Sequence, residues 1–182
     1  SDILLTALAR AIGNLYGEKA LLIDLEGHGR ETPPASVFTN ENHAGSFDVT
    51  RTVGWFTSIY PALLTLPDSG EIGVHIKHIK ETLRKIPNKG FGYGILQYLT
   101  APENKKDISF QTSPQIIFNY LGSFDGAIGG GIFKSVREFT KNTIHPELER
   151  THALDIEGRI LGGMLELSIS YNTRSYKQQT VE

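Results

Sequence analysis

The stretch ALLIDLEGHGRE, residues 20–31, joins a run of aliphatic residues to a charged, glycine-rich turn. Short runs rich in branched aliphatic residues are typical of buried strands, so we predict a strand over 20–26. Gly27 and Gly29 then allow the backbone to turn sharply. Four ionisable side chains lie within six residues: Glu26, His28, Arg30 and Glu31. Such groups are costly to desolvate unless they are paired or used in chemistry, although a charged surface turn is an equally simple interpretation.

The composition indicates a globular domain without a strong electrostatic partner. The 182 residues are 39% hydrophobic and 21% charged, enough to build a core. With 18 basic and 20 acidic residues the formal charge is −2, which gives no electrostatic reason to bind nucleic acid or an anionic membrane. The absence of cysteine excludes disulfides, thiolate nucleophiles and Cys-ligated zinc. No apolar run approaches the roughly 20 residues of a membrane helix, so we expect a soluble, cytoplasmic α/β or α+β domain.

Periodicity predicts the order of helices and strands. Apolar residues recur three and four apart in three segments, which we predict as helices: 1–16, 71–86 and 93–99. In the first helix we expect one buried face, consisting of Leu4, Leu8, Ala11, Ile12 and Leu15. Runs rich in β-branched residues or alternating in polarity predict strands over 52–60, ending before Pro61, over 114–122, and in a hairpin of 153–158 with 164–171. Polar and glycine-rich segments predict loops over 32–47, 101–113 and 123–150. Because both ends look like parts of helices, we expect a piece of a longer polypeptide.

Three other motifs each have a simpler interpretation. His75 and His78 have a spacing that can bind a metal on a helix, but no third ligand is near, which favours surface or boundary histidines. The glycines of 90–94 lack the lysine and the spacing of phosphate-binding loops, which favours a tight turn with close backbone packing. The basic residues of 77–89 favour a solvated helix face, with an acidic partner as the alternative.

Acid–base chemistry therefore has few candidates in this sequence. No Gly-x-Ser-x-Gly elbow, no Ser/His/Asp arrangement and no paired-histidine motif is present. Glu26 is the best candidate for proton transfer because it ends a predicted buried strand. Asn119 and Tyr120 lie in a second predicted strand and are the other polar groups placed to take part.

Four segments in one order resemble the later motifs of the epimerization domains of nonribosomal peptide synthetases. They are Glu26 to Glu31, Asp48 to Pro61, Pro87 to Leu96 and Phe118 to Gly122. The resemblance spans most of the chain. It implies a domain of two chloramphenicol-acetyltransferase-like halves, in which residues 1–182 are the C-terminal half. The expected fold is an α/β (α+β) sandwich with a mixed sheet flanked by helices.

The same resemblance implies a reaction and roles for five residues. The reaction is inversion of the α-carbon of an aminoacyl or peptidyl thioester, carried on the 4′-phosphopantetheine of a carrier domain. Glu26 matches the catalytic glutamate, and burial with suitable neighbours is how a glutamate becomes a base near neutral pH. Asn119 and Tyr120 match active-site positions, and Tyr120 is suited to hydrogen-bond an enolate or pass a proton. Arg30 is expected to orient or charge-balance Glu26, and His28 to have a structural role.

The resemblance also implies what surrounds this segment. The paired-histidine motif with the catalytic histidine belongs to the N-terminal half, which is absent here, so we expect the chain alone to be inactive. The implied partners are a peptidyl carrier domain, the N-terminal half and other synthetase modules, with no nucleic acid, membrane, metal or directly bound cofactor. Two alternatives remain: a condensation domain that forms peptide bonds, and a non-catalytic module that docks carrier domains. A paired-histidine motif upstream would favour an enzyme.

Overall fold

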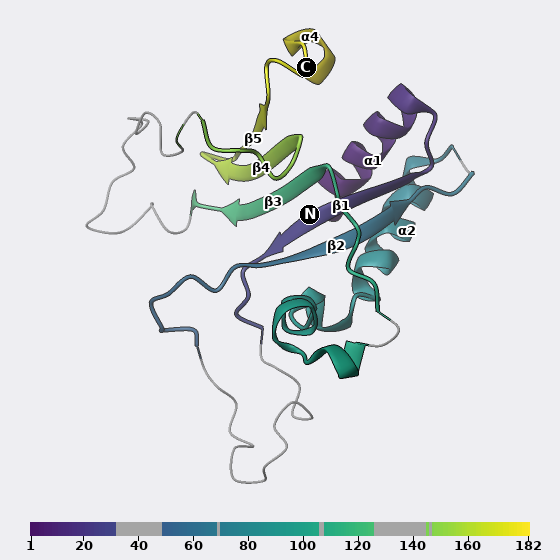
Figure 1. The fold of residues 1–182 in the computed structure, drawn as a ribbon. Coiled ribbons are helices and arrows are strands. Elements are labelled where there is room, and N and C mark those ends of the chain that lie inside the picture. Colours follow the sequence, from purple (N-terminus) through teal and green to yellow (C-terminus); the bar gives the residue numbers. More distant parts are fainter. Residues whose placement is uncertain (32–48, 69, 106–107, 126–144, 146) are drawn as a thin grey trace. The chain divides into compact units, whose positions relative to one another are not determined.

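The computed structural model describes residues 1–31, 49–68, 70–105, 108–125, 145 and 147–182. The predicted loop 32–47 and most of the predicted loop 123–150 lie outside these residues. The chain divides into two compact units, Ser1–Pro114 and Gln115–Glu182, and each is described by itself. Its elements, drawn in Figure 1, are α1 (Asp2–Tyr16), β1 (Ala20–Gly27), β2 (Ser58–Thr65), α2 (Ile72–Arg84), η3 (Pro87–Gly90), η4 (Ile95–Leu99), η5 (Pro102–Lys105), β3 (Ile116–Ser123), β4 (Leu154–Leu161), β5 (Met164–Tyr171) and α4 (Gln178–Val181).

The first unit is built on the antiparallel pair β1 and β2. Their register runs from Ala20 opposite Thr65 to Gly27 opposite Ser58. Side chains alternate between the two faces of a strand, so the buried positions of each strand share one face. They are Ile23, Leu25, Ala62 and Leu64. Helix α1 packs against β1 and α2 against β2, which forms the core of this unit (Figure 1).

The prediction of a strand over 52–60 is wrong in its position. Strand β2 begins only at Ser58 and continues through Pro61 to Thr65. Proline lacks an N–H, but β2 pairs with β1 along one side, and an edge strand tolerates proline. Residues 52–57 are not part of the sheet, and the carbonyls of Thr52 and Gly54 in this segment accept hydrogen bonds from the Arg30 guanidinium.

The first helix is confirmed, but the predicted buried face is only partly correct. Leu5, Thr6 and Ala9 are buried, Leu8 and Ile12 are half-buried, and Leu15 is 63% exposed. Burial of Thr6 is compatible with its hydroxyl, which donates a hydrogen bond to the carbonyl of Asp2 at 2.7 Å. Gly17 ends the helix, with φ of 73° and its N–H bonded to the Gly13 carbonyl.

His75 on α2 is buried, with 6% of its surface exposed, and is not the surface or boundary residue that we predicted. Its Nδ1 lies 2.9 Å from Nη1 of Arg10 on α1, and its Nε2 lies 3.1 Å from the carbonyl oxygen of Pro67. Because a guanidinium only donates, Nδ1 is the acceptor and Nε2 carries the proton. His75 therefore connects α1, α2 and the segment after β2.

Two further predicted segments are found, with modifications. The predicted helix 93–99 begins as a helical turn at Tyr93 and continues as the π-helix η4. Within the predicted linker 101–113 there is a short 3₁₀ turn, η5.

The second unit is a mixed three-stranded arrangement. Strands β3 and β4 are parallel, and β4 and β5 form the predicted hairpin. The hairpin is tighter than predicted, since β4 extends to Leu161 and leaves a two-residue turn. That turn is Gly162-Gly163, with φ of 60° and 72°, values that suit a two-residue β-hairpin turn. On the strands, Arg159 and Glu166 lie directly opposite each other and form an ion pair of 2.8 Å.

Asp125 fastens the end of β3 to this hairpin turn. Its Oδ1 accepts the N–H of Gly162 at 2.6 Å, and its Oδ2 accepts the N–H of Gly163 at 3.0 Å. The preceding residue, Phe124, donates its N–H to the carbonyl of Ile160. A carboxylate that accepts two backbone amides forms strong, charge-assisted hydrogen bonds.

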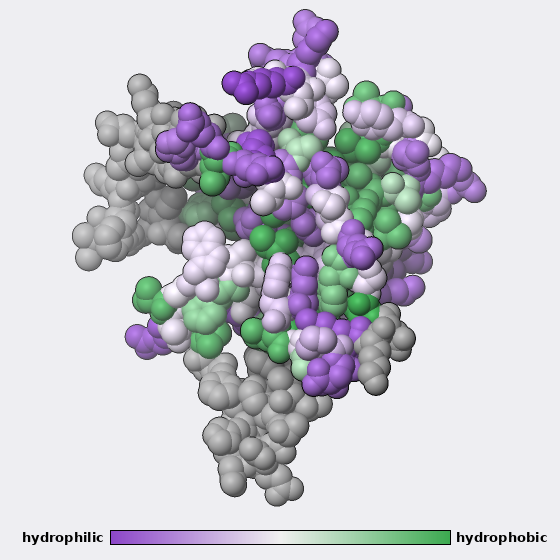
Figure 2. Space-filling model, in the orientation of Figure 1, coloured by the Kyte–Doolittle hydropathy of each residue, from purple (hydrophilic) through white to green (hydrophobic). Residues whose placement is uncertain are grey.

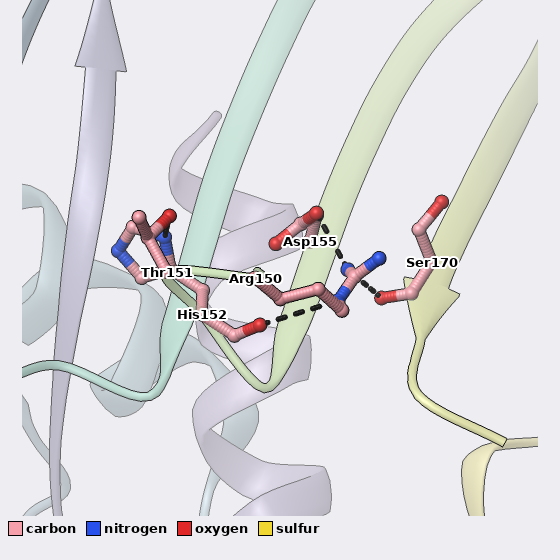
Figure 3. Close-up of polar contacts among 5 residues, drawn as sticks. All are labelled: Arg150, Thr151, His152, Asp155 and Ser170. Atoms are coloured by element: carbon pink, nitrogen blue, oxygen red, sulfur yellow. Dashed lines mark hydrogen bonds and ion pairs between the residues drawn. The ribbon is translucent and has the colours of Figure 1, made fainter. Parts of the chain in front are cut away.

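Arg150 fastens the opposite end of the hairpin (Figure 3). Its Nη2 donates to Asp155 Oδ2 at 2.5 Å and to the Ser170 carbonyl at 2.9 Å, and its Nε donates to the His152 carbonyl at 3.4 Å. Asp155 and Ser170 are register partners on β4 and β5. One guanidinium thus joins the chain entering β4 to both strands.

Replacement of His75 by Phe should destabilise the protein. Phe keeps most of the volume but removes the acceptor for Arg10 and the donor to the Pro67 carbonyl, so two partly buried groups each lose a hydrogen bond, while Arg10 keeps its bond to the Gly70 carbonyl. We expect the free energy of unfolding in urea to fall by about 1–3 kcal/mol. Lys77→Met, on the exposed side of the same helix, is the control. Equal unfolding free energies for His75→Phe and the control would contradict the assigned contacts.

Replacement of Asp125 by Ala should loosen the hairpin turn. We expect the amide hydrogens of Gly162 and Gly163 to exchange faster with solvent, and the unfolding free energy to fall by about 1–3 kcal/mol. Asp125→Asn keeps one acceptor oxygen and should lie between wild type and Asp125→Ala. Glu157→Ala, an exposed carboxylate on β4, serves as the control. Unchanged exchange at both glycines in Asp125→Ala would refute this role.

Candidate active site

Glu26 is the penultimate residue of β1 and lies opposite Ile59 of β2. By the alternation of the strand it shares a face with Asp24, away from the buried Ile23 and Leu25. On the same face of β2, Ile59 is 45% exposed. The carboxylate of Glu26 is therefore half-buried at the end of a strand, on the face opposite the helix-covered core.

The turn after β1 is fixed by Gly29 and Arg30. Gly29 has φ of 63°, and a Cβ there would lie 1.5 Å from the carbonyl oxygen of Phe56, so only glycine fits. The Arg30 guanidinium donates to the carbonyls of Val49 at 2.5 Å, Thr52 at 3.0 Å and Gly54 at 3.4 Å. Its central carbon also lies 4.3 Å from the centre of the Phe56 ring, within cation–π distance. Arg30 thus holds residues 49–56 against the end of β1, while its proposed role toward Glu26 stays a prediction.

His28 folds back over its own turn. Its Nδ1 accepts the backbone N–H of Arg30 at 3.0 Å, and its Nε2 lies 3.3 Å from Oε1 of Glu31. Because Nδ1 accepts a hydrogen bond, the imidazole is neutral with its proton on Nε2. Both ring nitrogens thus have partners within residues 28–31, an arrangement that suits the structural role predicted for His28.

Asn119 and Tyr120 lie next to each other on β3, with their side chains on opposite faces. Asn119 is opposite Glu157 of β4, whereas Tyr120 is opposite Gly158, where no side chain intervenes. Tyr120 shares its face with the buried Phe118. A small molecule that lies on one face of β3 therefore contacts only one of these two side chains.

The five predicted residues fall into two groups. Glu26, His28 and Arg30 meet at the end of β1 in the first unit, and Asn119 and Tyr120 belong to β3 in the second. Three residues without a predicted role lie near the first group: Tyr60, Glu31 and Lys89. Glu31 stood in the charged motif and Lys89 in the basic run, but the ion pair between them joins segments far apart in the sequence, which sequence spacing does not reveal.

The surface near the first group carries exposed apolar residues. Val53 is fully exposed, and Trp55 is 90% exposed, in the segment that Arg30 holds. Figure 2 shows hydrophobic side chains at the surface between hydrophilic ones on the face that it draws. The segment that Arg30 holds therefore presents two large apolar side chains to solvent.

Within the part of the chain that the structure describes, no three His, Cys, Asp or Glu side chains are grouped so as to bind a metal ion. His78 bonds to Thr65 through Nε2 at 2.9 Å, and His75 is occupied by Arg10 and Pro67, so both histidines have protein partners. None of the helices in the described segments is long and apolar enough to span a membrane.

Several curated relatives match the whole chain, and two of them illustrate the likeness. It is 40% identical over 182 residues to surfactin synthase subunit 1 of Bacillus subtilis, and 40% identical over 190 residues to tyrocidine synthase 1 of Brevibacillus parabrevis. The chain spans 5% and 16% of the length of these two proteins.

Solved structures confirm the predicted fold class, a mixed sheet flanked by helices of the chloramphenicol-acetyltransferase type. The epimerization domain from the third module of tyrocidine synthetase B matches 99% of this chain and 38% of its own, at 39% identity and a TM-score of 0.82. The first condensation domain of the CDA synthetase matches 98% of this chain and 35% of its own. Its TM-score is 0.53 at 12% identity, which shows the fold alone.

These matches confirm the resemblance predicted from the four sequence motifs. The model of the family called condensation domain covers residues 1–182. Because this match spans the whole chain, the chain belongs to the condensation-domain family.

Proposed function

We propose that this chain is part of an epimerase that inverts, from L to D, the α-carbon of an aminoacyl or peptidyl thioester. The observation that carries this proposal is the likeness to a solved epimerization domain, at 39% identity over nearly the whole chain. Residues 1–182 form the C-terminal subdomain of the active domain in this proposal. The N-terminal half supplies the paired-histidine motif, and the chain alone is inactive.

Glu26 acts as the base on one face of the substrate. Its carboxylate accepts the α-proton, the Cα–H electron pair moves onto the thioester as an enolate, and a proton then returns to the opposite face of Cα. The half-buried position of Glu26 at the end of a paired strand supports this role, because a general base must be held in place and partly shielded from water. The acid on the other face belongs to the N-terminal half.

Tyr120 stabilises the enolate by donating its phenolic proton in a hydrogen bond to the thioester oxygen. A phenol O–H can donate such a hydrogen bond, and Tyr120 is only half-buried on β3, which supports this role. Asn119 matches an active-site position as well, but its side chain lies on the other face of β3, so we assign it no bond to the thioester oxygen.

The substrate arrives on the 4′-phosphopantetheine arm of a peptidyl carrier domain, and the chain works beside other synthetase modules in the cytoplasm. The relatives support this setting, because the chain spans only small parts of large synthases. The protein itself holds no directly bound cofactor in this scheme. Glu26 and Tyr120 supply proton transfer and a hydrogen bond.

Condensation, the formation of a peptide bond by acyl transfer, is the second candidate. It is favoured by the name of the matching family model and by the shared fold of the CDA synthetase domain. The two reactions differ in what they need: condensation consumes an acceptor amine, whereas epimerization exchanges an α-proton without one.

Glu26→Gln in the intact domain should abolish most α-proton exchange. An amide of the same shape cannot accept the proton, so we expect incorporation of deuterium from solvent into a carrier-bound thioester to slow by roughly 100- to 10,000-fold. Mass spectrometry of the released amino acid measures it. Asp24→Asn, two residues earlier on the same face, is the matched control. Wild-type exchange in Glu26→Gln, or an equal loss in Asp24→Asn, would refute the role of Glu26.

Tyr120→Phe and Asn119→Ala should differ strongly, because their side chains lie on opposite faces of β3. We expect Tyr120→Phe to lower kcat for exchange by roughly 100- to 1,000-fold, the usual loss for one oxyanion donor, with little change in KM for the loaded carrier. Asn119→Ala should lose less than about tenfold, since it removes no contact to the reacting atoms. Equal losses in the two variants would show that the assignment of faces is wrong.

A further inference from the structure

Glu31 carries a carboxylate that is largely buried although it lies in a turn. Its side chain is only 13% exposed. Burying a carboxylate is costly unless other groups compensate its charge. The Lys89 ammonium does so here, with its Nζ 3.8 Å from Oε1, and the neutral His28 ring adds a polar contact, with its Nε2 3.3 Å from the same oxygen.

Lys89 reaches Glu31 from a backbone conformation that is rare for a residue with a side chain. Asn88 and Lys89 have φ of 47° and 51°, and Gly90 follows with φ of 77°. Left-handed conformations cost roughly 1–2 kcal/mol for each non-glycine residue, so contacts elsewhere must hold this turn in place.

Gly90 provides one such contact, with the ring of Tyr60. A Cβ at Gly90 would lie 2.1 Å from two ring carbons of Tyr60, so the backbone of Gly90 packs directly on the ring. The Lys89–Glu31 pair provides the other contact. The turn η3 is therefore attached both to β2 and to the charged turn after β1.

Tyr60 lies close to both Gly90 and Glu31 and stands beside the end of β1. It lies opposite Leu25, and its neighbour Ile59 lies opposite Glu26. Burial raises the pKa of the Tyr60 phenol, and the negative charge of Glu31 raises it further. The Glu31 carboxylate is therefore close enough to the Tyr60 phenol, at this end of the strand pair, to act on it electrostatically.

We propose that Glu31 and Lys89 are positioning residues for epimerization. Together they hold in place the turn of residues 27–31, which directly follows Glu26. The inference rests on the proposed role of Glu26. Lys89 draws the Glu31 carboxylate toward η3, the carboxylate fixes His28, and His28 fixes the backbone of Arg30. Neither residue contacts the substrate, so their loss misplaces the base without weakening carrier binding.

The test measures deuterium exchange in the intact domain, as kcat and as KM for the loaded carrier. Glu31→Gln and Lys89→Met remove one charge each, and the double variant removes both. We expect each single variant to lower kcat by roughly 10- to 100-fold with KM unchanged, because small displacements of a base have effects of this size. Since the two residues act as a unit, the double variant should be no slower than the slower single variant. Lys89→Arg keeps the cation and should retain kcat within about twofold.

Controls separate positioning from folding. Lys85→Met removes an exposed lysine from the end of α2 and should leave kcat unchanged. Rates are compared at a temperature at which circular dichroism shows each variant folded; if Glu31→Gln does not fold, Lys89→Met against Lys89→Arg decides. In Glu31→Gln, the Tyr60 pKa, followed by NMR, should fall yet stay above 10.0, because burial of the phenol remains.

The outcomes distinguish this inference from the proposed function. If Glu26→Gln abolishes exchange but Glu31→Gln and Lys89→Met keep the wild-type kcat, the positioning role is refuted and the epimerase is not. Multiplicative losses in the double variant, or a loss in Lys85→Met as large as in Lys89→Met, would also refute it. Wild-type exchange in Glu26→Gln would instead refute the proposed function.

Discussion

The Arg30 guanidinium takes the place of sheet pairing for the segment before β2. It binds the carbonyls of Val49, Thr52 and Gly54 and covers the Phe56 ring, while Gly29 lies against the Phe56 carbonyl. These groups are satisfied outside the sheet, and β2 begins after them at Ser58, in the register that puts Ile59 opposite Glu26. One cation and one glycine thus hold the segment before β2 against the end of the strand that carries the proposed base.

Much of the fold follows from local patterns in the sequence. The aliphatic run before Glu26 predicted β1, and the alternation of polarity predicted the hairpin of β4 and β5. Pro61 misled the prediction of β2, since proline ends most strands but is tolerated at an edge. His75 was misplaced for a related reason: its burial depends on Arg10 and Pro67, which a helical pattern does not reveal.

The five residues of the candidate site come from the sequence motifs, and their roles stay predictions. The two-residue period of a strand already implies that Asn119 and Tyr120 face opposite ways. The left-handed turn at Lys89 was not predictable, because lysine seldom adopts positive φ and does so here only through Gly90, Tyr60 and Glu31. Such a backbone conformation depends on contacts between segments far apart in the sequence. These contacts cannot be read from composition or from the spacing of residues.

The condensation-domain family includes domains that catalyse condensation and domains that catalyse epimerization on the same fold. Family membership alone does not decide between these two reactions, and epimerization is what we propose for this chain. The most direct measurement uses the intact domain and a carrier loaded with an L-aminoacyl thioester, with no acceptor amine present. Chiral analysis of the released amino acid should show the D-isomer accumulating to a mixture with the L-isomer. Retention of the pure L-isomer, with a peptide formed once an acceptor-loaded carrier is added, would contradict the account and assign this chain to condensation.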